Sequence, residues 1–269
     1  MKADRIISLA FKAYIWLALL FVFAPILTSF VFSFDANKFA AIPWGGFSTK
    51  WYAEAFGDPE VAKSLRNTVI VALSSSILAT LIGFTAAYTD YRYDFFGKKV
   101  YLALAFIPPT IPVIILGVAM LVLLGRIGLS GQLHSVIIAH VVYSLPFAMA
   151  LIRLRLSQMN KDLEAAAWNL GASQWRALKE IIIPFCLPAI FSALFLTMAV
   201  SFDEYAIAWF VSGFNETLPV RILILLQREV SPKVNAIGSL VFIVSMTLVM
   251  LAQIVFLMRE PGSGKGKRI

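Results

Sequence analysis

The sequence predicts an all-α polytopic membrane protein with six transmembrane helices. Of the 269 residues, 60% are apolar or aromatic and 14% are charged, and the mean hydropathy is +0.83. A soluble domain is roughly 45–50% apolar and about 25% charged. The apolar residues form six long charge-free runs, and about 20 such residues cross a bilayer as one helix. The runs lack the alternation of membrane β-strands, so helices are the remaining way to satisfy the backbone in lipid.

The six runs define the expected spans, which cover residues 13–34, 67–89, 100–125, 127–152, 181–202 and 234–258. The first run follows a basic N-terminus, as in a secretory signal. However, it is long, and Thr28 to Phe34 is too bulky for a small-residue cleavage site. We therefore expect a retained first span.

Prolines are expected to disrupt the start of the third span. Each proline removes a backbone donor and clashes one turn back, and Pro108, Pro109 and Pro112 lie close together there. Broken membrane segments are tolerated only beside protein or a cavity. Pro109 and Pro112 are therefore candidates for lining a pathway, although prolines are also common in membrane helices.

The positions of Lys and Arg predict that both termini are cytoplasmic. With the N-terminus inside, most of the 23 Lys and Arg residues fall in cytoplasmic segments, as the positive-inside rule requires. The net charge of +8 does not indicate nucleic-acid binding, because the basic residues form separate clusters between apolar runs. The single cysteine, Cys186, excludes an intrachain disulfide.

Three segments are expected along the chain. Residues 1–60 hold the cytoplasmic N-terminus, the first span and an external loop, and residues 61–258 form the main membrane domain. Residues 259–269 are rich in Gly and Lys and are expected to be a flexible basic tail.

We expect no catalytic and no metal site. The chain has no phosphate-binding Walker loop, no HExxH and no GxSxG with plausible partners. His134 and His140 lie in one apolar region, where lone histidines are more often polar contacts between helices than ligands. A membrane-embedded enzyme would need clustered acid, base or metal residues. A secondary transporter would need coupling charges or a filter inside the spans.

The long loop 153–180 is predicted to hold two helices joined by a tight turn. Asn160 or Asp162 can cap the first helix, its alanines favour the helix, and Gly171 suits the left-handed position that ends it. Ser173 can then cap a second helix, which leads directly into the fifth span.

Apolar residues recur at helical spacing on the first of these helices. They are Leu163, Ala166, Ala167 and Leu170. A short helix of this kind either inserts into a groove of another protein or lies on the lipid surface. The spacing leaves both interpretations open.

The segment Glu164 to Pro184 resembles the EAA loop of permease subunits in ATP-binding-cassette (ABC) importers, with Gly171 thirteen residues before the proline of an Ile-Pro pair. The resemblance extends over about 61–258 and includes three further motifs. They are Ile107-Pro108-Pro109-Thr110-Ile111-Pro112, Ser144-Leu145-Pro146-Phe147 and Ser201-Phe202-Asp203-Glu204-Tyr205. The chain resembles most the second permease subunit of spermidine/putrescine importers, and opine and related amine systems look similar.

The resemblance implies the transmembrane fold of a type I ABC importer in the bacterial inner membrane. In such importers two permease subunits form the pathway, a separate ATPase dimer binds and hydrolyses ATP, and a soluble binding protein delivers the solute. The chain itself is then not an enzyme and binds no cofactor. The residues that the resemblance assigns to ATPase coupling are Glu164, Ala165, Ala166, Ala167, Gly171, Ala172 and Pro184.

The chain departs from the EAA pattern at one position. The glutamate of the family corresponds to Ala165, whereas the glutamate of this chain, Glu164, lies one residue earlier and is rotated by roughly 100° on a helix. We therefore expect Glu164 to matter less for docking than the alanine and glycine surface.

An acidic pair near the end of the fifth span is a candidate substrate contact. Asp203 lies about 22–28 Å along this span and therefore in the outer third of the hydrocarbon core, or at its edge. Ionisable residues there usually face a cavity or a partner. The pair could attract an amine-bearing solute, or it could cap a helix or bind an arginine such as Arg66 or Arg126. The candidate pathway residues are Asp203, Glu204, Tyr205, Pro109 and Pro112.

The substrate class stays open between a polyamine and an opine, an amino-acid-like or another small solute.

Overall fold

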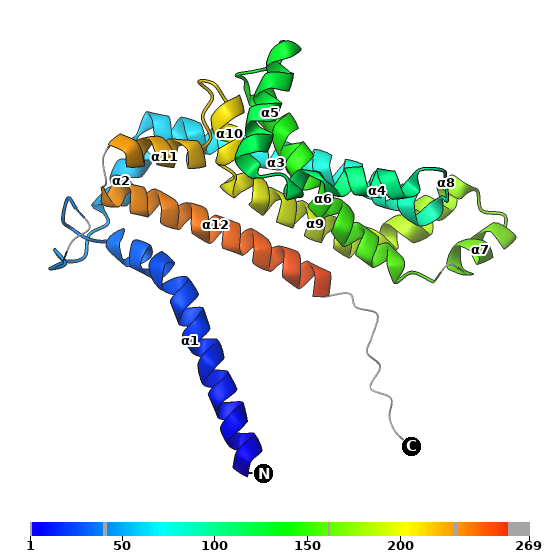
Figure 1. Cartoon of the computed structure of the whole chain (residues 1–269), viewed down its shortest axis with the longest axis horizontal. Helices are drawn as coiled ribbons and strands as arrows, with labels where there is room; N and C mark the ends of the chain where they lie inside the picture. The colour runs from blue at the N-terminus through cyan, green and yellow to red at the C-terminus, as the bar shows by residue number, and fades with distance from the viewer. Residues whose placement is uncertain (1, 40–41, 161, 229–230, 258–269) are drawn as a thin grey trace. The chain divides into compact units, whose positions relative to one another are not determined.

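A computed structural model describes residues 2–39, 42–160, 162–228 and 231–257. These residues form two compact units, one from the described part of residues 2–62 and 222–242 and the other from the described part of residues 63–221 and 243–257. The predicted basic tail, 259–269, lies outside the described residues. The helices (Figure 1) are α1 (Lys2–Phe32), α2 (Lys50–Gly57), α3 (Pro59–Arg92), α4 (Lys98–Phe106), η1 (Pro108–Thr110), α5 (Val113–Arg126), α6 (Leu133–Ser157), α7 (Asp162–Asn169), α8 (Gln174–Ala177), η2 (Leu178–Ile182), α9 (Ile183–Asp203), α10 (Ala206–Val211), α11 (Leu218–Arg228) and α12 (Pro232–Leu257).

The described residues confirm the all-α polytopic fold. Five helical stretches are long and apolar enough to cross a membrane, and α5 is a shorter apolar helix. The five are α1, α3, α6, α12 and the continuous stretch Gln174–Asp203, which joins α8, η2 and α9.

The predicted disruption of the third span is confirmed, because the proline-rich segment divides it into α4, the 3₁₀ turn η1 and α5. The start of the fourth span differs from the prediction. The fourth helix begins at Leu133 rather than at Ile127. Gly128 and Gly131 adopt φ angles of +74° and +77°, which prolong the turn after α5.

The first unit is held together by polar contacts around Asp35 and Lys233. The Oδ1 atom of Asp35 accepts hydrogen bonds from the backbone N–H groups of Asn37 and Gly45, at 3.0 and 2.9 Å. Lys233, at the start of α12, donates to the Asp58 carboxylate at 2.8 Å. These contacts anchor the segments that connect α1, α2 and α12.

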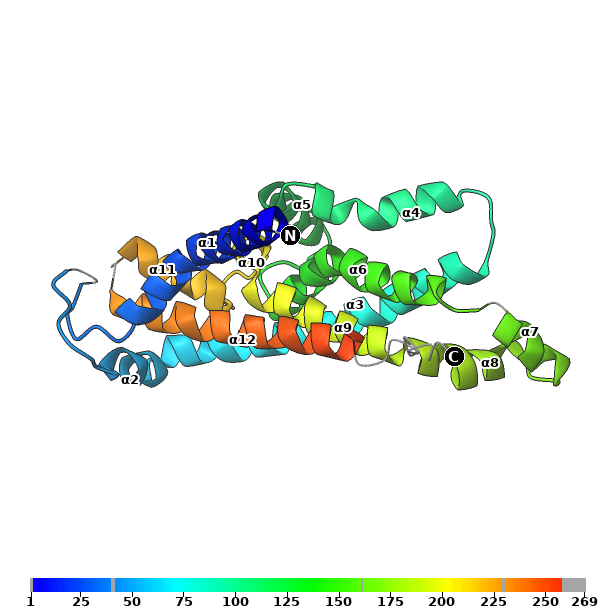
Figure 2. The same ribbon diagram turned by 90° about the horizontal axis from the view of Figure 1, so that it is seen from below.

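The second unit is built around α6, which packs along α9. In both views α3, α6 and α9 lie side by side, with α7 and α8 at one end and α5 and α10 at the other (Figure 1, Figure 2). The centre is fully buried and contains Ala148, Met149, Ile152, Leu156, Ile182, Cys186, Ala189 and Ala193. Small residues let the helices approach closely, which is how packing stabilises helix pairs in lipid.

A buried polar contact joins α3, α6 and α9 within this unit. Ser201 of α9 lies 2.8 Å from Nδ1 of His140 on α6, and its hydroxyl accepts a hydrogen bond from Ser75 of α3 at 2.9 Å. All three side chains are at least 97% buried. His140 therefore serves as a polar contact between helices, as expected for a lone histidine in a membrane helix.

Candidate functional site

The loop between α6 and α9 folds as the predicted pair of helices. Asn160 accepts a hydrogen bond from the backbone of Asp162 at 2.9 Å, at the start of α7. Gly171 ends α7 with a φ of +83°, a left-handed conformation that a residue with a Cβ adopts only with strain. The Ser173 hydroxyl accepts from the backbone N–H of Arg176 at 3.2 Å and caps α8. Because α8 runs through η2 into α9, the second helix of the loop is continuous with a spanning helix.

The outward face of α7 is apolar and uncovered. Leu163 is 47% exposed and Leu170 is 89% exposed, and Trp175 of α8 is 70% exposed. Of the predicted coupling residues, Ala165, Ala166, Gly171 and Pro184 are exposed, whereas Ala167 and Ala172 are half-buried. An exposed apolar surface on a short helix outside the apolar spans is typical of a protein–protein contact.

Glu164 lies on the opposite, inward face of α7. It is 5% exposed, and its carboxylate lies 3.6 Å from Nε of Arg92, the last residue of α3. The Arg92 guanidinium also stacks on Trp168 of α7, at 4.5 Å from the ring centroid. The one-residue shift from the EAA pattern thus places this carboxylate on the buried face of α7, against α3.

Tyr93, which directly follows α3, binds the second helix of the loop. The Gln174 amide donates a hydrogen bond to the Tyr93 hydroxyl at 2.6 Å. Arg92 and Tyr93 were not singled out from the sequence, because nothing in their local pattern links them to a loop that far along the chain.

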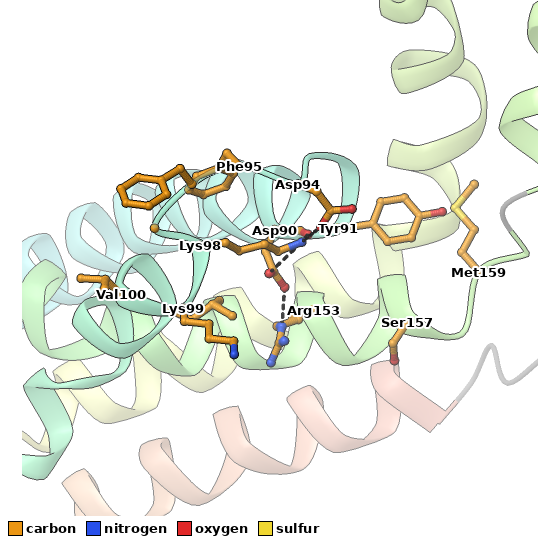
Figure 3. A pocket seen from close by; sticks show the side chains of 13 residues that line it. Asp90, Tyr91, Asp94, Phe95, Lys98, Lys99, Val100, Arg153, Ser157 and Met159 are labelled. Atoms are coloured by element: carbon orange, nitrogen blue, oxygen red, sulfur yellow. Dashed lines mark hydrogen bonds and ion pairs between the residues drawn. The ribbon is translucent and has the colours of Figure 1, made fainter.

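The same end of α3 is tied to two further helices through Asp90, which is 6% exposed. Arg153 of α6 donates to the Asp90 carboxylate at 2.5 Å, and Lys98 of α4 lies 3.6 Å from it (Figure 3). Lys98 also pairs with Asp94 at 3.0 Å. These residues line a cavity of about 980 Å³ that Phe95 and Met159 also border.

At the other end of the unit the acidic pair lies where α9 ends, with Asp203 as its last residue and Glu204 in the short break before α10. The Glu204 carboxylate accepts a hydrogen bond from the backbone N–H of Ile207 at 2.9 Å and caps α10. Asp203 is exposed, and Tyr205 is 48% exposed. The pair therefore divides into a capping residue, Glu204, and an exposed carboxylate, Asp203.

The interrupted third span contacts α10 through α5. Gly117 of α5 allows this approach, because a Cβ there would lie 2.8 Å from the ring of Phe210 and 3.3 Å from Cα of Ile207. Pro109 belongs to η1, which packs on α6, and Pro112 is exposed just before α5. The prolines and the acidic pair thus lie on different elements. The contact between α5, which follows the prolines, and α10, which follows the acidic pair, links the two regions.

Comparison with known proteins places this architecture in one family. Residues 79–260 match the family described as binding-protein-dependent transport system inner membrane component. The chain is 33% identical to the spermidine/putrescine transport system permease protein PotC of Haemophilus influenzae, over 91% of this chain and 95% of that protein. It is 29% identical to the putrescine transport system permease protein PotI of Escherichia coli K12, over 82% and 81% of the two chains.

A solved structure shares the fold. A chain of a bacterial alginate ABC transporter, crystallised in complex with an alginate pentasaccharide-bound periplasmic protein, superposes with a TM-score of 0.74 at 16% identity and covers 97% of both chains. The family model and the curated relatives agree with this fold. The chain therefore belongs to the inner membrane components of binding-protein-dependent transport systems, the permease subunits of ABC importers, in which a separate subunit hydrolyses ATP.

Proposed function

We propose that this chain is one of two different permease subunits of an importer for polyamines or similar amine-bearing cations. The observation that carries the substrate class is the exposed carboxylate of Asp203, the last residue of α9. An ionisable residue at the end of a spanning helix is costly unless it meets a cavity or a charged partner. The names of the relatives PotC and PotI support the same substrate class.

The α7 end of the molecule faces the cytoplasm in this proposal, and the acidic pair faces outward. The basic residues Arg92, Lys98, Arg153 and Arg176 then lie inside, as the positive-inside rule favours. Both termini are cytoplasmic. A soluble binding protein delivers the solute to the α10 end, where Asp203, Tyr205 and the proline-interrupted third span form part of the pathway.

The exposed face of α7 and the Gly171 turn dock an ATPase dimer, which binds ATP, while the permease binds no cofactor. The small residues Ala165 and Ala166 and the uncovered Leu170 support this assignment, because they give α7 a narrow apolar surface. The continuous helix from Gln174 to Asp203 then carries a displacement of the loop across the membrane.

Uptake of labelled spermidine by the assembled transporter tests the substrate class. Asp203→Asn should reduce uptake at least tenfold with the ATPase still bound, since a neutral amide no longer attracts the cation. Glu204→Gln keeps an acceptor for the Ile207 N–H and should reduce uptake less. Glu216→Gln is the matched control, because Glu216 pairs with Arg221 at 3.5 Å elsewhere in the same unit. Unchanged uptake by Asp203→Asn rejects the proposed cation contact.

Co-purification tests the docking surface. Ala166→Glu places a charge on the exposed face of α7 and should release the ATPase while the permease stays in the membrane. Lys179→Glu, at a position of η2 that is also exposed, is the control and should retain the ATPase. Retention of the ATPase by Ala166→Glu, with normal transport-coupled ATP hydrolysis, contradicts docking on this face.

A further inference from the structure

We propose that Arg92 is a positioning residue that transmits the displacement of α7 to α3, in parallel with the covalent path from α8 into α9. This inference rests on the proposed docking of the ATPase on α7. It adds a second, non-covalent route by which the loop that holds α7 and α8, here called the coupling loop, displaces the packed helices α3, α6 and α9. This route consists of the contacts of Arg92 with Glu164 and Trp168.

The geometry of α7 separates its two faces. Glu164 and Trp168 lie four residues apart, so their side chains share one face of the helix. The Arg92 guanidinium contacts both, as an ion pair of 3.6 Å with Glu164 and as a stacked cation 4.5 Å from the centre of the Trp168 ring. The face that carries Leu163 and Ala166 is left open for a partner.

Burial makes the Glu164 carboxylate depend on the Arg92 cation. The side chains of Glu164 and Arg92 are 6% and 31% exposed, and a carboxylate with so little access to water needs a cation beside it. Arg92 is the cation that the structure places against Glu164. A displacement of α7 that left Arg92 behind would leave a charge buried and unpaired, so the two residues move together.

The end of α3 passes this displacement to other helices. Asp90 lies two residues before Arg92 and is bound to Arg153 of α6 and to Lys98 of α4 (Figure 3). Near its middle α3 shares the Ser75–Ser201–His140 contact with α6 and α9. The coupling loop thus acts on α9 through the chain and on α3 through Arg92, and these two helices meet again at that polar contact.

The experiment uses the assembled transporter in lipid with three variants, Arg92→Gln, Glu164→Gln and the double variant. Each is measured for bound ATPase, for ATP hydrolysis and for solute transported per ATP hydrolysed. We expect the single variants to keep the ATPase and to lose about tenfold in transport per ATP. The double variant should lose no more transport per ATP than either single variant, because both substitutions remove the same contact, the pair between Arg92 and Glu164.

The matched control is Arg176→Gln. Arg176 lies in the same loop, but its guanidinium pairs with Glu180 of η2 at 3.1 Å on the surface and does not reach α3. This variant should transport as the wild type does. A transport-to-ATP ratio in Arg92→Gln equal to that of the wild type would overturn the inference, as would additive losses in the double variant.

A purely structural role makes a different prediction. If Arg92 only held the fold of α7, Arg92→Gln would lose bound ATPase in proportion to transport, and the ratio in the remaining complexes would be normal. Should Arg92→Gln fail to accumulate, Glu164→Gln and Arg92→Lys decide, because the first removes the charge that Arg92 pairs with and the second keeps a cation beside Glu164. The inference predicts a lowered ratio in Glu164→Gln and a higher ratio in Arg92→Lys than in Glu164→Gln, and a wild-type ratio in Glu164→Gln contradicts it. The Ala166→Glu variant tests docking separately, since it alters the opposite face.

Discussion

Replacing Gly83 with alanine should push α3 and α6 apart and destabilise the chain. A Cβ at this position would lie 2.9 Å from the Cβ of Ala148 and 3.0 Å from the backbone nitrogen of Met149. Carbon atoms pack at about 3.5–4.0 Å, so the two helices must separate by roughly 0.5–1 Å. Neither opposing atom can rotate away, because one belongs to the backbone and the other is fixed to it.

The expected cost follows from two opposing effects. Overpacking a close-packed core costs about 1–3 kcal/mol, and Ala148 and Met149 are fully buried. Alanine is about 1 kcal/mol more favourable than glycine inside a helix, which offsets part of this cost. The difference is a net loss of up to about 2 kcal/mol. In a chain of this size that lowers the melting temperature by up to about 8 °C.

Thermal unfolding of the full chain in detergent measures this change, with Gly125→Ala as the matched control. A Cβ at Gly125 of α5 meets no atom within 4 Å, so that substitution should leave the melting temperature unchanged or slightly higher. A melting temperature of Gly83→Ala at or above the wild-type value would refute the close approach of α3 and α6.

Three further results are expected. Gly171→Ala should weaken ATPase binding, whereas Gly171→Asn should largely retain it. Open space surrounds Gly171, so only its φ of +83° opposes a side chain, and Asn adopts this left-handed conformation more readily than Ala. Equal binding by both variants would contradict this. Gly117→Val should block the approach of α10 to α5 and abolish uptake without releasing the ATPase, and normal uptake would show that this packing is dispensable. Burial alone would raise the pKa of the Asp58 carboxyl, but the hydrogen bond from Lys233 and those from two backbone N–H groups leave this pKa below its ordinary value. The stabilisation by Asp58 should therefore be complete above about pH 5 and disappear as the pH falls through the lowered pKa, below about 4. The difference in melting temperature between the wild type and Asp58→Asn, followed from pH 7 to 3, measures it, and a difference that persists at the lowest pH would contradict the assignment.

The sequence by itself determined the features that depend on local chemistry. Length and apolarity predict the spanning helices, because a continuous apolar helix satisfies its own backbone hydrogen bonds in lipid. The turn between α7 and α8 follows from Gly171 and Ser173, whose conformational freedom and capping hydroxyl act within a few residues. Family membership follows from the same loop, because its motif is a local run of residues.

Only the tertiary structure decided which residues meet. The sequence shows that Glu164 is rotated away from the family's register, but not that the rotation turns it toward Arg92, because the partner lies on a different helix. The two possible roles of the acidic pair became distinct in the same way, when the start of α10 placed the Ile207 N–H against Glu204 and left Asp203 exposed. Helix periodicity determines which side chains share a face, whereas the packing of α3, α6 and α9 determines what each face contacts.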